Sequence, residues 1–166
     1  EMRESDWSSD VCSSDLTNPL TDLCDIQALA DIAHHHGALL VVDNSFATPV
    51  LQRPVEFGAD IVVHSGTKFL DGQGRIMIGA VCGTTALVDK VMGTFLRSGG
   101  LNAASYNAWT AMKGLETLAL RVKAQSASAL TLATWLQGHP KVARVYYPGL
   151  QSHPQHALAM RQHNGM

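Results

Sequence analysis

Two short apolar runs, each followed at once by polar residues, constrain the fold of this chain more than any other feature. Residues 39–42 read Leu-Leu-Val-Val and precede Asp43, whereas residues 61–63 read Ile-Val-Val and lead through His-Ser-Gly-Thr to Lys68. Continuous apolar runs of this length are typical of strands that are covered on both faces. Since ligands of open α/β sheets collect at the carboxyl ends of strands, we expect Asp43 and Lys68 at one ligand-binding edge.

The rest of the chain alternates between helical and extended patterns, which predicts an α/β fold. Apolar residues at helical spacing predict a helix over residues 25–36, ended by Gly37. A short apolar run after a glycine-rich loop predicts a third strand at residues 79–83. We further expect a helix over residues 85–96, one or two helices over residues 104–136 with a mild break at Gly114, and a strand over residues 142–147.

The residue types at these strand ends suit pyridoxal 5′-phosphate (PLP). The PLP aldehyde is held by a lysine amine that burial or a nearby cation makes nucleophilic, and Lys68 is the candidate. A buried carboxylate keeps the ring nitrogen protonated, a role for which we predict Asp43. Short hydroxyls and backbone N–H groups bind phosphate, and Ser65, Gly66 and Thr67 supply both. The same residue types also occur in ordinary α/β turns, so the flanking sequence has to decide.

Several flanking stretches carry a resemblance to a known family: residues 38–49, 58–65, 71–75, 107–109, 113–118, 146–150 and 153–156. They recur in this order in the γ-family of PLP-dependent enzymes of cysteine and methionine metabolism, which the chain closely resembles from Thr17 to Met166. Residues 71–75, Asp-Gly-Gln-Gly-Arg, are most similar to the O-succinylhomoserine sulfhydrylases within that family. Gly66 departs from the alanine that is more usual between the serine and the threonine.

The resemblance implies the large domain of the fold type I PLP-dependent transferases, with a mainly parallel sheet and flanking helices. Residues 17–119 would form part of this PLP-binding domain. Residues 120–166 would begin a C-terminal α+β domain, with a helix bridging the two.

The resemblance also implies a reaction and the residues that carry it. Lys68 would be the Schiff-base lysine and the general base and acid, Asp43 the ring-nitrogen partner, and Ser65 and Thr67 the phosphate ligands. The implied reaction is a γ-replacement of methionine biosynthesis, in which sulfide and O-succinylhomoserine give homocysteine, in a homotetrameric parent enzyme. Cystathionine γ-synthase and γ-lyase are the nearest alternatives, and a non-catalytic α/β domain that kept the fold is another.

Both ends of the chain call for separate explanations. Residues 1–16 have no apolar periodicity and repeat Ser-Ser-Asp. Residues 6–16 can be back-translated into a common sequencing-library adapter, so we expect the segment to be a disordered artefact. Residues 162–166 fall where the family continues further into its C-terminal domain. We therefore expect an internal fragment that is inactive in isolation.

Composition and charge argue against several other classes of protein. The 166 residues carry a net charge of −2 and their Lys and Arg residues are scattered, which is not typical of nucleic-acid binding. No stretch approaches the roughly 18 consecutive apolar residues of a membrane span. Cys24 and Cys82 lack metal-ligand or paired spacing, which predicts reduced thiols in the cytoplasm. We expect no metal site, because the consecutive His34, His35 and His36 would point about 100° apart on a helix.

Arg75 and four aromatic residues are not assigned to the cofactor. Arg75 follows the glycine-rich loop and either steers an anionic substrate or forms a surface salt bridge. Tyr106, Trp109, Tyr146 and Tyr147 are expected to pack in the core or between domains.

Overall fold

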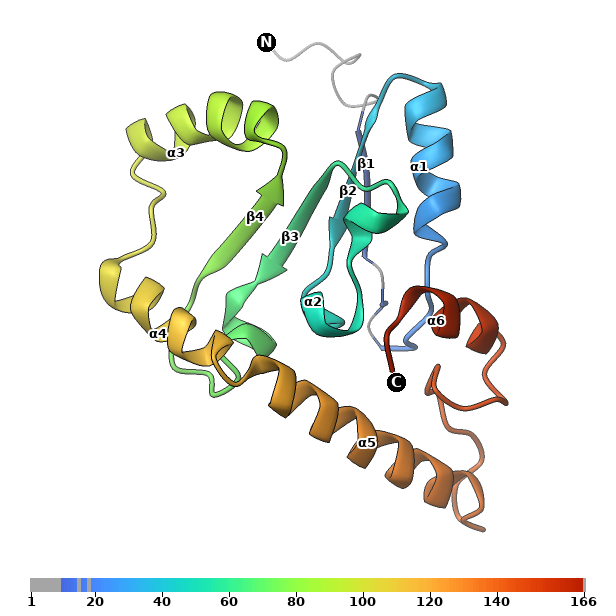
Figure 1. Cartoon of the computed structure of the whole chain (residues 1–166). Coiled ribbons are helices and arrows are strands. Elements are labelled where there is room, and N and C mark those ends of the chain that lie inside the picture. The colour runs from blue at the N-terminus through green and yellow to red at the C-terminus, as the bar shows by residue number, and fades with distance from the viewer. Residues whose placement is uncertain (1–9, 15, 18, 166) are drawn as a thin grey trace.

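The sheet has four strands in the order β1-β2-β3-β4 (Figure 1). The computed structural model describes residues 10–14, 16–17 and 19–165. The strands are β1 (Asp10–Ser14), β2 (Leu39–Asp43), β3 (Ile61–Ser65) and β4 (Gly79–Gly83). β1, β2 and β3 run parallel, whereas β4 is antiparallel to β3. The α/β class and the three strands predicted from apolar runs are confirmed.

The sheet is mixed because the chain turns straight back after β3. Gly66 N donates to Ile78 O over 2.8 Å, and Ile78 N donates to Thr67 Oγ1 over 3.3 Å. These two bonds close the connection like a wide hairpin, whereas a parallel fourth strand would need a crossover to the other end of the sheet.

The disorder expected for residues 1–16 is wrong for Asp10–Ser14, which form β1. Their register along β2 runs from Asp10 opposite Leu39 to Ser14 opposite Asp43. An uncovered strand edge offers a row of main-chain donors and acceptors, so it can pair with a segment whose side chains carry no strand pattern. Residues 1–9 and 15 lie outside the described residues, and the adapter origin of the segment stays a prediction.

Helix α1 (Ile26–His35) covers one face of the sheet and confirms the first predicted helix. It begins where the side chain of Asp25 accepts a hydrogen bond from Ala28 N, and Gly37 follows it with φ +70°. The buried face of α1 packs against the inward side chains of β2 and β3, and the cluster consists of Ile26, Ala30, Ala33, Ala38, Leu40, Val42, Ala59 and Val62. The three predicted histidines occupy the polar end of this helix.

Three short helical segments follow the strands near the predicted site. α2 (Thr48–Leu51) and the 3₁₀ turn η2 (Pro54–Phe57) lie between β2 and β3. The π-helical turn η3 (Gly66–Leu70) follows β3 and contains Lys68.

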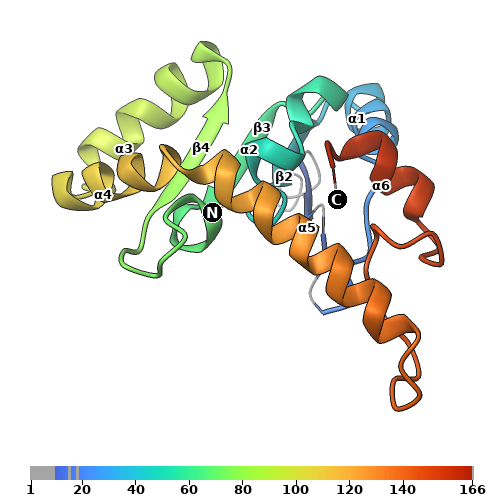
Figure 2. The same ribbon diagram turned by 60° about the horizontal axis from the view of Figure 1, so that its bottom comes forward.

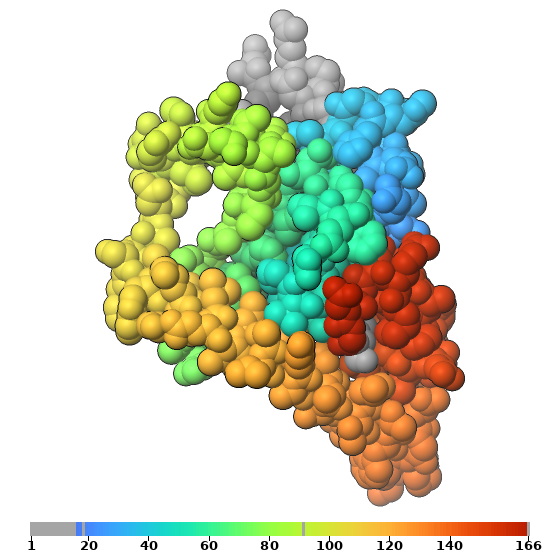
Figure 3. Space-filling view, viewed as in Figure 1, coloured from blue at the N-terminus to red at the C-terminus, as the bar shows by residue number. Residues whose placement is uncertain are grey.

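The segment after β4 forms an arm that stands away from the body of the molecule (Figure 3). We define the arm as residues 79–109, from β4 through η4 (Ala86–Gly93) and α3 (Thr94–Ser98) into α4 (Ser105–Leu115). η4 and α3 together confirm the helix predicted at residues 85–96. Tyr106 and Trp109 are exposed on α4, so they do not pack in the core formed by the described residues, and the expected packing between domains stays a prediction.

Helix α5 (Leu118–Gln137) is the longest of the described elements, and with the bottom of the molecule turned forward it crosses the front diagonally (Figure 2). The stretch predicted as one or two helices thus forms two, with the break just after Gly114 and Leu115. A second core cluster joins α5 to α2 and η3 through Ala47, Leu51, Leu70, Leu118 and Val122. None of the helices within the described ranges has the length and apolarity of a membrane span.

The strand predicted at residues 142–147 is wrong, because this segment forms neither strand nor helix. An extended segment is counted as a strand only when it pairs with another, and no described strand lies beside it. Tyr146 is exposed there, whereas Tyr147 is half-buried. Tyr146 is therefore not a core residue among the described residues either, and its packing between domains stays a prediction.

Helix α6 (His156–Gln162) returns to the start of α1, where two glutamines bind main-chain groups (Figure 1). Gln155 accepts from Leu23 N over 2.7 Å and donates to Leu23 O over 2.6 Å. Gln162 accepts from Ile26 N and donates to Cys24 O, both over 3.0 Å. The last elements of the chain are therefore anchored to its beginning.

Candidate cofactor site

Asp43 ends β2, and one of its carboxylate oxygens is already held by the next turn. Oδ1 accepts from Ser45 N over 2.9 Å and from Ser45 Oγ over 2.6 Å. Among the described residues, the second oxygen, Oδ2, accepts no hydrogen bond. The carboxylate is therefore oriented by Ser45 with one oxygen available to a ligand.

Ser45 also reaches the neighbouring strand. Its Oγ accepts from Ser65 N over 2.6 Å, and the side chain is 7% exposed. A single buried hydroxyl thus ties the carboxylate after β2 to the residue that ends β3. Sequence reasoning missed Ser45, although a serine two residues after an aspartate is a recognised signal for a side-chain-to-backbone turn.

Lys68 lies in η3, directly beyond the end of β3. Its backbone is not helical, with φ −84° and ψ −120°, so the turn is kinked at this residue. Within the described part of the chain, its Nζ makes no hydrogen bond or ion pair. Thr67 Oγ1 accepts from Ile78 N over 3.3 Å, which leaves its hydroxyl proton free to donate.

The four predicted residues therefore gather at the carboxyl ends of two neighbouring parallel strands. Asp43 pairs in register with Val63, two residues before Ser65. The burial expected for Asp43 is wrong, since its side chain is exposed. Lys68, for which burial or a nearby cation is expected, is exposed as well. The reason is that the described residues cover the α1 face of the sheet, while Asp43 and Ser65 alternate onto the opposite face.

A buried polar layer supports the turn after Asp43. Asn44 Nδ2 donates to Gln52 O over 2.9 Å, and Gln52 Nε2 donates to Asn44 Oδ1 over 3.2 Å. Thr48 is fully buried with φ +61°, a conformation that a β-branched residue adopts only under strain. Neither contact has a signal in the sequence, because both depend on how the turn packs.

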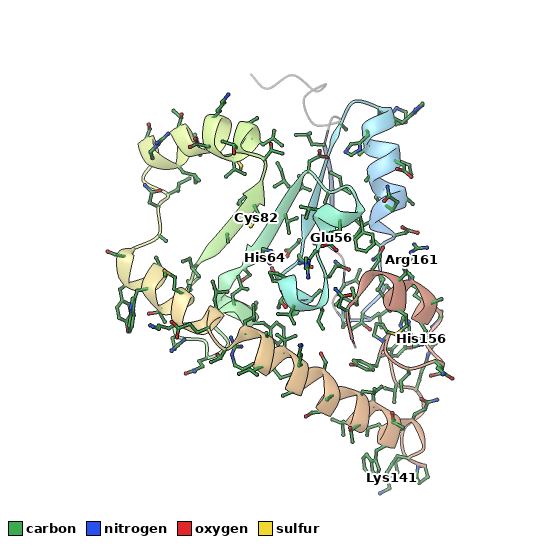
Figure 4. The ribbon with its side chains drawn as sticks, in the orientation of Figure 1. Glu56, His64, Cys82, Lys141, His156 and Arg161 are labelled. Carbon is green, nitrogen blue, oxygen red and sulfur yellow. The ribbon has the colours of Figure 1, made fainter. Side chains whose placement is uncertain are left out.

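His64 lies on β3, in the central part of the molecule (Figure 4). It is 7% exposed, and within the described residues its Nδ1 has no hydrogen-bond partner. Burial lowers the pKa of His64, and the backbone of Asn44 and the charge of Asp43 oppose that shift only in part. The imidazole is therefore neutral at neutral pH.

Arg75 forms an ion pair rather than a free cationic group. Its Nε and Nη2 donate to Asp71 Oδ1 over 2.8 and 2.6 Å, and its backbone N donates to Asp71 Oδ2 over 2.8 Å. Asp71 is 1% exposed. Burial raises the pKa of Asp71, but the hydrogen bonds and charge of Arg75 outweigh burial and hold it below its usual value. Of the two predicted roles for Arg75, the structure shows the salt bridge, with a buried partner.

The glycines of the same loop are required by its backbone. Gly72 and Gly74 have φ of +76° and +66°, values that side-chain-bearing residues rarely adopt. Asp71-Gly72-Gln73-Gly74-Arg75 is therefore a tight turn closed by its own first and last residues. Within the described ranges, no group of three potential metal ligands comes together.

Comparison with known proteins identifies the family. The model of the Cys/Met metabolism PLP-dependent enzyme family matches residues 11–166. The chain belongs to this family, whose members use PLP. The resemblance seen in the sequence is confirmed.

Curated relatives include several named activities. The O-succinylhomoserine sulfhydrylase of Pseudomonas aeruginosa is 57% identical over 149 residues, covering 90% of this chain and 37% of the relative. The O-succinylhomoserine sulfhydrylase of Mycobacterium tuberculosis is 48% identical over the same shares of both chains. The cystathionine beta-lyase of Coxiella burnetii is 44% identical, covering 88% of this chain and 38% of the relative. The chain thus spans well under half the length of these relatives.

Solved structures agree with the fold. A methionine gamma lyase from Micromonospora echinospora superposes with a TM-score of 0.88 at 35% identity, over 94% of this chain and 43% of that one. A cystathionine gamma synthase from Xanthomonas oryzae pv. oryzae, solved with aminoacrylate and cysteine, gives a TM-score of 0.87 at 39% identity, over 95% and 41%. The α/β arrangement described above is therefore that of part of these enzymes.

Proposed function

We propose that this chain is part of an O-succinylhomoserine sulfhydrylase, which replaces the succinyloxy group at Cγ of O-succinylhomoserine by sulfide, giving homocysteine and succinate. The single observation that carries the proposal is the 57% identity with the Pseudomonas aeruginosa sulfhydrylase. Identity to the cystathionine gamma-synthase of Mycobacterium leprae is lower, at 40% over a stretch of equal length. A sulfhydrylase is therefore favoured over a synthase.

The donor set at the strand ends fits PLP. Among the described residues, Lys68 offers an amine without a hydrogen-bond partner and Asp43 offers one unbonded carboxylate oxygen, while Thr67 offers a hydroxyl proton. We assign Lys68 to the cofactor aldehyde, Asp43 to its ring nitrogen, and Ser65 and Thr67 to its phosphate. PLP supplies an electron sink for carbanions formed beside the substrate amino group.

The residues of this chain would then divide the remaining work. Lys68 Nζ removes the proton from the substrate Cα and moves protons at Cβ while succinate leaves and sulfide adds at Cγ. Asp43 would hold the proton on the ring nitrogen, and Ser45 would fix the orientation of the carboxylate through its hydrogen bonds to Oδ1. Ser65 and Thr67 hold the phosphate end in place.

The wider architecture is part of the same proposal. Residues 17–119 would belong to the large domain of a fold type I transferase, and residues 120–166 would begin its C-terminal domain. The exposed apolar residues of the arm, among them Phe95 and Trp109, support burial in an assembly such as the homotetramer of the family. The unpaired Cys24 and Cys82 are compatible with the cytoplasm.

A product assay on the chain completed to the length of its relatives tests the function. O-succinylhomoserine is supplied with sulfide, with cysteine, or with neither. Homocysteine formed faster from sulfide than cystathionine is from cysteine supports a sulfhydrylase. Faster cystathionine formation identifies a synthase instead, and release of a keto acid and ammonia without a thiol identifies a lyase.

Replacing the ring-nitrogen partner tests the site within that enzyme. We expect Asp43→Ala to keep some PLP and to lose most turnover, because the carboxylate stabilises charge that develops during the reaction rather than binding alone. Parallel measurement of bound PLP and kcat checks this. Near-normal turnover would refute the role of Asp43.

A further inference from the structure

The turn that carries Lys68 is closed by a side chain from a distant helix. η3 has only five residues, so its last carbonyl groups lack partners inside the turn. The carbonyl oxygens of Phe69 and Leu70 accept instead from Arg121 Nη1 over 2.9 Å and Arg121 Nη2 over 3.3 Å. Arg121 lies on α5, more than fifty residues further along the chain, and so acts as a cap supplied from outside the turn.

The guanidinium of Arg121 is itself held in place by the junction of α4 and α5. Nη2 also donates to Gly114 O over 2.8 Å, and Nε donates to Thr117 Oγ1 over 3.0 Å. Hydrogen bonds from a charged donor are stronger than neutral ones, and a planar guanidinium can make several at fixed angles. A lysine at this position could reach one carbonyl but could not bridge them all.

Two glycines provide the space for this contact. A Cβ added at Gly114 would lie 2.3 Å from Leu70 O, a distance that no real structure tolerates. A Cβ added at Gly72 would lie 2.1 Å from Arg121 Nη1, and Gly72 also has φ +76°. The turn, the α4–α5 junction and Arg121 therefore fit together closely, as expected of a built contact rather than a chance one.

Arg121 acts directly next to the kink at Lys68. The carbonyl of Lys68 accepts from Gly72 N over 2.8 Å, and Asp71 N donates to Gly66 O over 3.0 Å. The following two carbonyls are those bound by Arg121, so the backbone is fixed on the C-terminal side of the kinked residue. Without the two hydrogen bonds from Arg121, rotation at Phe69 and Leu70 would let the backbone of Lys68 relax toward a regular helix.

We propose that Arg121 is a positioning residue for Lys68, which holds the kinked turn so that the lysine amine projects toward the strand ends. The proposal rests on the assignment of Lys68 as the cofactor lysine. It makes α5 part of the catalytic scaffold, although no residue of α5 is assigned to the cofactor itself.

We call the hydrogen bonds from Arg121 to the carbonyls of Phe69 and Leu70 the clamp. Hydrogen exchange on the cofactor-free chain tests the clamp separately from the function. In Arg121→Met, the amides of Asp71 and Gly72 should exchange at least about tenfold faster, the effect of losing one charge-assisted hydrogen bond. Amides of β2 and β3 should stay within about twofold. Arg97→Met is the matched control, because Arg97 is exposed and bonds one helical carbonyl, that of Gly93, in the arm. Unchanged exchange at Asp71 and Gly72 would overturn the proposal.

Milder variants guard against general unfolding. Arg121→Lys should give exchange rates between those of the unchanged chain and Arg121→Met. In Arg121→Ala, millimolar methylguanidinium should slow exchange at Asp71 and Gly72 again, whereas methylammonium at equal concentration should not. A purely structural loss would show no such preference for the guanidinium shape, and that result would also contradict the proposal.

Cofactor trapping then connects the clamp to Lys68. The chain is mixed with PLP, borohydride is added at intervals, and the peptide carrying Lys68 is quantified. The rate of fixation at Lys68 should fall at least about tenfold in Arg121→Met and stay unchanged in Arg97→Met. Normal fixation in Arg121→Met despite faster exchange overturns the positioning role but leaves the proposed function intact. If no variant fixes PLP at Lys68, the unchanged chain included, the result contradicts Lys68 as the cofactor lysine. The exchange data would then still show whether Arg121 holds the turn.

Discussion

The α1 side of the sheet and the arm use similar apolar residues to opposite effect. Ile26, Leu40 and Val42 are fully buried between α1 and the strands, whereas Phe95 and Trp109 in the arm are 68% and 58% exposed. Both regions are joined through the same sheet, since β4 pairs along the length of β3. The arm is therefore held by main-chain pairing between β4 and β3, whereas the α1 side of the sheet is also stabilised by side-chain packing. The Lys68 turn lies where the two regions meet.

Truncating one buried side chain on the α1 side and one exposed side chain in the arm should give the largest difference in stability between the two regions. Leu40→Ala removes a fully buried side chain and should lower the free energy of unfolding by about 2–5 kcal/mol. Phe95→Ala in the arm should change it by less than about 0.5 kcal/mol. Urea unfolding followed by circular dichroism measures both. Equal losses would show that the arm is packed as well as the body.

Asp71 gives the next largest expected effect, at the boundary between the regions. Asp71→Ala removes a buried carboxylate and its hydrogen bonds to Arg75, which stays partly solvated, so it should lower the free energy of unfolding by about 2–3 kcal/mol. Asp89→Ala, at an exposed position in the arm, is the matched control. A loss confined to the control, or no difference between the two, would contradict the buried ion pair.

The buried His163 should make the free energy of unfolding depend on pH. Burial lowers the pKa of His163 from 6.5 to about 4. The unfolded chain therefore binds the proton more readily, so this stabilisation is complete above about pH 6.5 and is lost as the pH falls from there toward 4. The shift corresponds to roughly 3 kcal/mol.

Unfolding measured at pH 7 and at pH 4 checks that sign. We expect His163→Gln to flatten the pH dependence by up to that amount, and the exposed His35→Gln to leave it unchanged. A pH dependence as steep in His163→Gln as in the unchanged chain would show that the histidine is not buried there.

The anchoring of α6 onto α1 carries the smallest expected effect. Gln162→Ala breaks the bonds to Ile26 N and Cys24 O and should cost about 1–2 kcal/mol. Gln137→Ala, exposed at the end of α5, should be neutral. Hydrogen exchange at the Ile26 amide should quicken only in Gln162→Ala, and protection unchanged there would mean that α6 is not held by this side chain.

Local sequence signals predicted much of the α1 side. Apolar runs before Asp43 and Lys68 marked β2 and β3, and Asp25 and Gly37 marked the ends of α1, because these features depend on neighbouring residues alone. The strand expected at residues 142–147 failed since a strand needs a partner that no described residue supplies. β1 is present although the sequence did not predict it, because the open edge of β2 pairs with a segment that has no strand pattern.

The site was predicted by residue type but not by environment. Asp43, Ser65, Thr67 and Lys68 lie at the predicted strand ends, yet the acid expected to be buried is exposed. Ser45 was missed although a serine two residues after Asp43 is a recognised turn signal. Arg121 was missed because it binds main-chain carbonyls. Arg121 in particular bonds carbonyls whose positions depend on the packing of α4 and α5, which no local pattern records.

The central claim is that the ends of β2 and β3 form a PLP site with Lys68 as its covalent residue. Titrating PLP into this chain, fixing it with borohydride and mapping the labelled peptides tests the claim most directly. We expect most of the fixed PLP on Lys68, and we expect Lys68→Ala to remove the visible absorbance band of the bound cofactor. PLP spread evenly over the surface lysines, or a band that survives Lys68→Ala, would contradict it.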